Sequence, residues 1–367
     1  MALTGNIGEW SEIYVHLRLL ADGVLYSGDE KLKKIINKYL KIIKIFRTEK
    51  GFTEDNVYDI DAVNSKIFKT GNGNNIELLQ SEFDKAAKSL LKHIQTHKTQ
   101  DDKKKYEFKD VEKFIKSADI YSLKAKSSDK KDIRMIVHDL NIDMESEMGF
   151  SVKSKLGGNS TLFNANKNGT NFLYKITGGI TDERIEYLNS LSDSPQKRRK
   201  GFFKQWFDLL EEWGYKVEYE QVINPVFASN LRYIDSEFHK ILSNCLLLYY
   251  SHKCGKNISS IVRSVSQQDP CGLQTENRYD WYEFAMKQFL IIYALGMTAN
   301  KPWNRKYDAN GGYIVVTEKG DIVCYHFYDR VQLENYLFNN TAFDTPSTSR
   351  HDFYQIYRDK ESDNVYF

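Results

Sequence analysis

The sequence predicts an α/β fold, with a β-sheet core flanked by helices and a helical C-terminal portion that ends in a β-hairpin. Three observations support this prediction. Apolar residues recur at helical spacing near the N-terminus, the pattern changes to strand-like alternation further along the chain, and two short apolar runs near the C-terminus enclose a turn. Because 41% of the 367 residues are hydrophobic, the chain can bury a sizeable core.

The predicted helices follow from the spacing of apolar residues. Residues 7–21 and 31–46 each carry apolar side chains every three or four positions, so we expect an amphipathic helix in each segment. Gly23 marks the end of the first helix. Further helices are expected over residues 76–97, 108–117, 181–191, 201–213, 230–252 and 279–296.

The predicted strands fall into two groups. We expect strands over residues 120–126, 132–139, 150–156, 313–316 and 322–327. The first three lie close together in the chain, which predicts an antiparallel meander. The last two flank a short polar turn and predict a hairpin. Residues 157–171 are rich in Gly, Asn, Ser and Thr and predict a loop.

The domain division rests on a change of character along the chain. Residues 1–195 contain the predicted meander and would form the core, and residues 196–367 would form a more helical portion that includes the hairpin. No linker rich in proline or glycine separates the two parts, so one continuous fold is the alternative.

Composition limits the compartment and the partners. Lys and Arg total 52 against 50 Asp and Glu, so a nucleic-acid surface must come from local basic clusters such as residues 103–105 and 197–200. The four cysteines form no C-x-x-C pair, which is typical of a reducing compartment. With no signal peptide and no apolar stretch of about 20 residues, we expect a soluble, cytoplasmic protein.

The residues that point to chemistry are Asp132, Ser151 and Lys153. Side chains two apart on a strand share a face, and a hairpin turning near 141–145 would bring Asp132 opposite Ser151 and Lys153. A carboxylate beside an ammonium suits metal-assisted phosphodiester cleavage, in which Mg²⁺ activates water and lysine stabilises phosphate charge. The alternative is that Asp132 merely starts a strand and Lys153 is a surface lysine. Asp139 is a further candidate, although it faces away from Asp132 on an ideal strand.

Five short motifs resemble the HpaII family of type II restriction endonucleases. In chain order they are GNIGEWSE at 5–12, DIRMIVHD at 132–139, GFSVKSKLG at 149–157, STLFNAN at 160–166 and DTPSTSRH at 344–351. The resemblance implies a PD-(D/E)xK nuclease core, a mixed sheet flanked by helices, that cuts double-stranded DNA at CCGG with Mg²⁺. A palindromic site favours a two-fold symmetric homodimer, and a cognate DNA methyltransferase would act on the same site.

The resemblance also assigns roles to individual residues. Asp132 matches the metal-binding aspartate of the nuclease core and Lys153 matches its lysine, but Ser151 stands where Asp or Glu is usual. A second metal-binding carboxylate must then come from elsewhere, and the nuclease group often contributes a glutamate from the first helix. Glu9 and Glu12 lie near one face of that helix and are the candidates. The alternative is that both are ordinary solvent-facing residues.

Two polar segments are candidates for DNA contact. Amide, hydroxyl and basic side chains suit base edges and phosphates, and arginine can bond to guanine. The first segment follows the Lys153 strand, and its candidates are Lys155, Asn159, Ser160, Thr161, Asn164, Asn166 and Asn171. The second lies near the C-terminus, and its candidates are Ser347, Thr348, Ser349, Arg350 and His351. The alternative for both segments is a solvated turn or helix cap.

Other chemistries lack their motifs in this chain. There is no G-x-x-x-x-G-K-[ST] loop for ATP-driven translocation, no H-E-x-x-H for a zinc protease, and no Gly-rich methyltransferase-type loop. Two rival functions remain. One is a DNA-binding protein that does not cleave, which Ser151 makes plausible, and it predicts binding without metal-dependent nicking. The other is a protein-interaction module that uses the Asn-rich loop, and it predicts no salt-dependent DNA binding.

Overall fold

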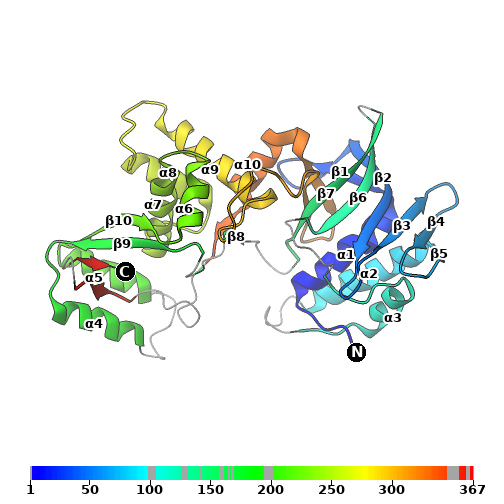
Figure 1. The fold of residues 1–367 in the computed structure, drawn as a ribbon, viewed down its shortest axis with the longest axis horizontal. Coiled ribbons are helices and arrows are strands. Elements are labelled where there is room, and N and C mark those ends of the chain that lie inside the picture. Colours follow the sequence, from blue (N-terminus) through cyan, green and yellow to red (C-terminus); the bar gives the residue numbers. More distant parts are fainter. Residues whose placement is uncertain are drawn as a thin grey trace. The chain divides into compact units, whose positions relative to one another are not determined.

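The computed structural model divides the chain into two compact units, and Figure 1 labels most of their helices and strands. Unit 1 comprises Met1–Ser160, Ala294–Gly296 and Lys306–Tyr336, and unit 2 comprises Thr161–Tyr293, Met297–Arg305 and Leu337–Phe367. The structure describes residues 2–97, 105–124, 131–140, 143–156, 161–163, 166, 169–193, 202–344, 355–360 and 364–366. Of these, residues 161–163, 192, 193, 202 and 203 are described in their backbone alone.

A nine-stranded mixed sheet forms the centre of unit 1. In spatial order its strands are β1 (Val24–Gly28), β12 (Ile322–His326), β11 (Gly312–Val316), β7 (Met144–Ser154), β6 (Ile133–Asp139), β2 (Lys34–Thr48), β3 (Asp55–Asp61), β4 (Lys66–Thr70) and β5 (Ile76–Leu79). The β11–β7 and β1–β12 pairs are parallel, and the others are antiparallel. Because β1 also pairs with β2, the first six strands close into a barrel-like ring. The α/β class is therefore confirmed, whereas the sequence did not indicate the closure.

Helix α1 (Ile7–Asp22) shows how local sequence fixes both of its ends. Asn6 and Glu9 form a capping box, in which each side chain accepts a hydrogen bond from the other residue's backbone N–H at 2.9 Å. Gly23 follows the helix in the left-handed conformation, with φ of 65°, and its N–H closes onto Leu19. The predicted helix over 7–21, with its end at Gly23, is confirmed.

The core of unit 1 joins the sheet to α1, α2 (Gln80–His97) and α3 (Lys109–Ser117). The apolar side chains of the helices and of the strands pack into one continuous cluster, whose burial is the main stabilising contribution. Fully buried members are Trp10, Ile13, Leu17, Phe83, Leu90, Ile115, Ile45, Met135, Val137 and Phe150. The helix predicted over 108–117 is confirmed as α3.

Two predictions about unit 1 are wrong, those over 31–46 and 120–126, and the helix predicted over 76–97 is confirmed only from Gln80 onward. The segment 31–46 forms β2 rather than a helix, and its apolar positions are mostly β-branched, which favours a pleated strand. Its isoleucines are Ile35, Ile36, Ile42, Ile43 and Ile45. The segment 76–97 starts with β5 before α2 begins, and the described part of 120–126 contains no strand. As a result β6 has β2 as its second neighbour instead of 120–126.

Two predicted hairpins are present. Strand β6 runs antiparallel to β7, with Asp139 opposite Met144 and Ile133 opposite Phe150, so β7 begins six residues earlier than expected. Strands β11 and β12 pair antiparallel across the predicted polar turn. The first hairpin carries the candidate residues, so its register decides the geometry of the site.

Unit 2 is largely helical. It contains α4 (Asp182–Asp193), α5 (Phe202–Glu212), α6 (Pro225–Arg232), α7 (Phe238–Tyr250), α8 (Ile258–Gln268), most of α9 (Arg278–Leu295) and the end of α10 (Arg330–Asn340). Its strands are β8 (Thr161–Phe163), β9 (Phe172–Thr177), β10 (Lys216–Val222), β13 (Ala342–Phe343), β14 (Tyr357–Arg358) and β15 (Val365–Tyr366). The helices expected at 181–191, 201–213 and 279–296 are confirmed, but the one expected over 230–252 is interrupted between α6 and α7.

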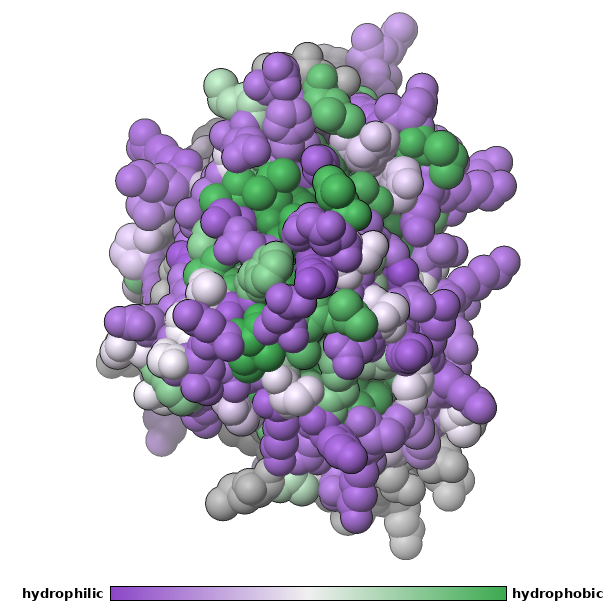
Figure 2. Space-filling model, turned by 90° about the vertical axis from the view of Figure 1, so that its right-hand side faces the viewer, coloured by the Kyte–Doolittle hydropathy of each residue, from purple (hydrophilic) through white to green (hydrophobic). Residues whose placement is uncertain are grey.

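The surface of the chain is mixed in character. Figure 2 shows one face, on which hydrophilic side chains surround smaller apolar groups. Exposed apolar side chains on the β3–β5 extension of the sheet include Val63, Phe68 and Leu79. None of the helices in the described part of the chain combines the length and apolar character that a membrane crossing requires.

Candidate active site

The β6–β7 hairpin holds the side chain of Asp132 in a fixed position. Asp132 lies just before β6, and its backbone N–H donates to the carbonyl of Phe150 at 2.8 Å. Its carboxylate oxygen Oδ2 accepts a hydrogen bond from the backbone N–H of Val152 at 2.7 Å and from the Ser151 hydroxyl at 3.3 Å. The predicted juxtaposition of Asp132 with the Ser151 strand is therefore present.

Lys153 follows on the same strand as Ser151. Strand β7 runs parallel to β11, which places Ser151 beside Tyr313 and Lys153 beside Val315. Ser151 is only 3% exposed, whereas Lys153 is half-buried. The Ser151 hydroxyl is therefore enclosed beside Asp132, whereas part of Lys153 is exposed to solvent.

Glu12 joins this cluster from the middle of α1. Its side chain is 25% exposed, and burial raises its pKa from 4.5 to about 7. The negative charge of Asp132 raises this pKa further, while the charges of Lys124 and Lys153 lower it. Helix α1 packs against β7, which brings Glu12 near the hairpin although it lies 120 residues before Asp132 in the chain.

Lys124 forms an ion pair with Glu12. Its Nζ atom lies 3.6 Å from Oε1 of Glu12. Sequence analysis placed Lys124 in a strand and gave it no role. No motif marks this lysine, because it reaches Glu12 only through the tertiary fold, so a sequence pattern could not have found it.

Glu9, the other candidate on α1, is occupied elsewhere. Its Oε2 atom accepts the backbone N–H of Asn6 in the capping box at 2.9 Å. This contact is a common structural use of a glutamate at the third helical position. Glu9 thus has a structural contact of its own, whereas Glu12 is influenced by the charge of Asp132.

Asp139 lies at the opposite end of β6 from Asp132. The six-residue advance along the strand from Ile133 corresponds to about 20 Å. Asp139 is 5% exposed and faces the same side of β6 as the buried Met135 and Val137. It is not brought to Asp132.

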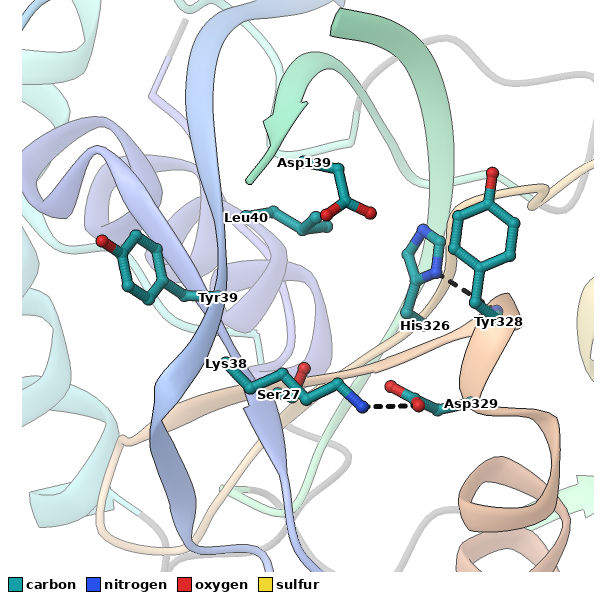
Figure 3. A pocket seen from close by; sticks show the side chains of 8 residues that line it. All are labelled: Ser27, Lys38, Tyr39, Leu40, Asp139, His326, Tyr328 and Asp329. Atoms are coloured by element: carbon teal, nitrogen blue, oxygen red, sulfur yellow. Dashed lines mark hydrogen bonds and ion pairs between the residues drawn. The ribbon is translucent and has the colours of Figure 1, made fainter. Parts of the chain in front are cut away.

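Asp139 instead lines a cavity of about 550 Å³ in unit 1, drawn in Figure 3. In the wall of this cavity, Nζ of Lys38 pairs with Oδ1 of Asp329 at 2.5 Å. Nδ1 of His326 accepts a hydrogen bond from the backbone N–H of Tyr328 at 3.2 Å. Burial lowers the pKa of His326, which favours the neutral imidazole. This cavity shares no lining residue with the Asp132 cluster.

Comparison with known proteins identifies the family. A family model described as HpaII restriction endonuclease matches residues 6–367, which is nearly the whole chain. The chain belongs to the HpaII restriction endonuclease family. It is 38% identical over 355 residues to the type II restriction enzyme HpaII of Haemophilus parainfluenzae, covering 97% of this chain and 94% of that relative. No solved structure matches the chain.

Membership in the HpaII family makes this chain a type II restriction endonuclease that acts on double-stranded DNA. The resemblance seen in the five sequence motifs is confirmed. The substrate gives the cluster of Glu12, Asp132 and Lys153 a chemical context, because phosphodiester cleavage needs charge stabilisation at the phosphate.

The carboxylates of the site fit a hard divalent cation. Among the described residues, no group of three or more His, Cys, Asp or Glu side chains is arranged to hold a metal. Mg²⁺ is commonly bound through one or two carboxylates, with water and substrate phosphate as the other ligands. Glu12 and Asp132 supply that number, and a bound cation would offset the cost of burying the charged form of Glu12.

The candidate DNA contacts of the first segment are described in part. Lys155 lies at the end of β7, where its Nζ is 5.7 Å from the centre of the Tyr336 ring and burial lowers its pKa. Asn166 and Asn171 belong to unit 2. The backbone N–H of Asn166 donates to the Thr170 hydroxyl at 2.9 Å, and the Asn171 side chain accepts the next backbone N–H at 3.1 Å. These bonds shape the local turns.

The remaining candidates cannot be placed in the site. Only the backbone of Thr161 is described, within β8. Outside the described residues lie Asn159, Ser160, Asn164, Ser347, Thr348, Ser349, Arg350 and His351. Their roles in DNA contact stay predictions.

Proposed function

We propose that the protein hydrolyses phosphodiester bonds of double-stranded DNA at a short palindromic site, CCGG, in a reaction that depends on Mg²⁺. The observation that carries the proposal is the convergence of Glu12, Asp132 and Lys153 from three separate elements in a member of the HpaII family. The CCGG site follows from the resemblance of the sequence motifs to that family.

Each residue has a defined part in this proposal. Glu12 and Asp132 would hold the metal ion, which would lower the pKa of an attacking water and neutralise charge on the leaving oxygen. Lys153 would contact the phosphate and stabilise the negative charge that develops there. Ser151 would keep Asp132 oriented through its hydrogen bond, as groups behind a ligand commonly do.

The wider setting follows from the palindromic site. A two-fold symmetric homodimer would present one active site to each DNA strand, with each subunit reading one half-site. A cognate DNA methyltransferase would protect the same sequence in the host without binding this chain. The restriction endonuclease would act in the cytoplasm, where it encounters incoming DNA.

Digestion of unmethylated phage DNA, with and without Mg²⁺, tests the proposal when the fragment ends are sequenced. Discrete fragments that end within CCGG and appear only with Mg²⁺ are expected. Discrete ends at another sequence would reject the site but retain the nuclease. Binding in a mobility-shift assay without any cleavage would instead favour a DNA-binding protein that does not cut.

A further inference from the structure

A buried clamp fixes the chain immediately before Lys124. Glu49 is fully buried and pairs with Nε of Arg47 at 2.5 Å, while its Oε2 accepts the backbone N–H of Tyr121 at 3.1 Å and the hydroxyl of Ser122 at 2.6 Å. Arg47 in turn donates to the Ser122 carbonyl. Strand β2 and the residue that follows it therefore hold this segment through three polar contacts.

The next two residues carry the segment to α1. Leu123 is 7% exposed and packs against Gly5, where a Cβ would lie only 2.3 Å from the leucine Cδ1 atom. The side chain of Lys124, the next residue, is 59% exposed, and its Nζ atom lies 3.6 Å from Oε1 of Glu12. The buried contacts of Tyr121, Ser122 and Leu123 thus fix the backbone that places this lysine beside Glu12.

Stability alone does not account for this arrangement. An exposed ion pair contributes little to folding, and a buried pair such as Arg47–Glu49 is weak evidence for stability because desolvation offsets attraction. Electrostatics gives Lys124 a clearer role. The Lys124 ammonium, 3.6 Å from Oε1 of Glu12, supplies a positive charge that partly offsets the cost of burying this carboxylate beside Asp132.

We propose that Lys124 is the counter-ion of Glu12 in the metal-free enzyme and that it turns to a DNA phosphate when Glu12 binds Mg²⁺. The inference rests on the proposed function, because it assumes that Glu12 is a metal ligand. An ammonium and a divalent cation compete for the same carboxylate, so Lys124 weakens metal binding while DNA is absent. A DNA phosphate offers Lys124 another anion, which couples metal binding to DNA binding.

The test compares full-length Lys124→Met and Lys124→Arg with wild type in two measurements. Calorimetric titration with Ca²⁺ in the absence of DNA, at about pH 8.5 where Glu12 is mostly ionised, should show about two- to fivefold tighter binding in Lys124→Met. Single-turnover cleavage with Mg²⁺ should be slower by about tenfold, because a charged phosphate contact is lost. Lys124→Arg keeps the charge and should resemble wild type in both measurements.

A matched control and a second neutral variant make the result decisive. Lys66→Met removes another exposed lysine, paired with Glu77 at 2.6 Å on the β4–β5 hairpin, and should change neither quantity. Like Lys124→Met, Lys124→Gln should bind Ca²⁺ more tightly and cleave DNA more slowly. Loss of folding cannot produce this pair of changes, because unfolding weakens Ca²⁺ binding and cleavage together. Unchanged or weaker Ca²⁺ binding, or unchanged cleavage, in both neutral variants overturns the inference. A wild-type protein that does not cleave overturns the proposed function, and the inference with it.

Discussion

The carboxylate of Asp132 accepts a hydrogen bond from the backbone N–H of Val152, 2.7 Å away across the β6–β7 hairpin. The Ser151 hydroxyl donates to the same oxygen at 3.3 Å. Within the described residues the second oxygen, Oδ1, makes no hydrogen bond, so Asp132 is held by one oxygen and presents the other. This arrangement underlies the predictions that follow.

Replacing Asp132 with Asn should lower single-turnover cleavage on the order of 1,000-fold or more, because the amide cannot supply the charge that a metal ligand needs. DNA binding in a mobility-shift assay should persist, since the substitution is isosteric and leaves the fold intact. Asp143→Asn, which changes an aspartate of the same hairpin whose side chain is 92% exposed, is the control. Near-normal cleavage by Asp132→Asn would remove this residue from the site.

Replacing Ser151 with Ala should slow cleavage by about tenfold, the lower end of the range for a group that orients a metal ligand. The Val152 N–H still holds Asp132 in this variant, so the effect stays well below that of Asp132→Asn. Rates measured over a range of Mg²⁺ concentrations check the prediction. A variant with unchanged rates would show that the 3.3 Å hydrogen bond does not contribute to catalysis.

Glu12→Gln should stabilise the metal-free protein at pH 8 by about 1–3 kcal/mol, because it removes a carboxylate whose folded pKa is raised to about 7. The native state binds this proton more tightly than the unfolded chain, whose pKa is near 4.5. Stability of the wild type therefore falls as pH rises from about 4.5 to about 7, and the advantage of the variant vanishes below about pH 4.5. Thermal midpoints across this range measure the effect. An advantage that does not vary with pH would contradict the assigned pKa.

Asp119→Asn should destabilise the protein by about 3–5 kcal/mol, because it leaves the buried ammonium of Lys69 without its counter-charge. Lys69 is fully buried, and its other partners are the backbone carbonyls of Gly71 and Asn74. Glu77→Gln breaks the exposed pair with Lys66 and should cost no more than about 1 kcal/mol. Chemical denaturation compares the two variants, and equal losses would rule out the burial argument.

Local patterns in the sequence predicted α1, with its end at Gly23, and the β11–β12 hairpin, because caps and turns depend on neighbouring residues. The segment 31–46 shows where such patterns fail. Its apolar spacing fits a helix, but pairing with β1, β3 and β6 decides that it is a strand. Closure of the sheet depends on the pairing of β1 with both β2 and β12, and these two partner strands lie far apart in the chain.

The same distinction applies to the site. Asp132 and Ser151 could be paired from the sequence because a single short hairpin joins their strands. The choice between Glu9 and Glu12 could not be made, since both fit one helix face and only the capping box separates them. Lys124 was missed altogether, because its place depends on a clamp in which Glu49 contacts a residue 72 positions away.

Single-turnover cleavage of a CCGG-containing DNA by Glu12→Gln and Glu9→Gln tests the account most directly. The two glutamates lie on the same helix and receive the same substitution, but Glu9 is engaged in the capping box, whereas the charges of Asp132 and Lys153 act on Glu12. The account predicts that Glu12→Gln loses cleavage on the order of 100-fold or more at saturating Mg²⁺, while Glu9→Gln cleaves at nearly the wild-type rate. Loss of cleavage in Glu9→Gln with activity retained in Glu12→Gln would contradict it.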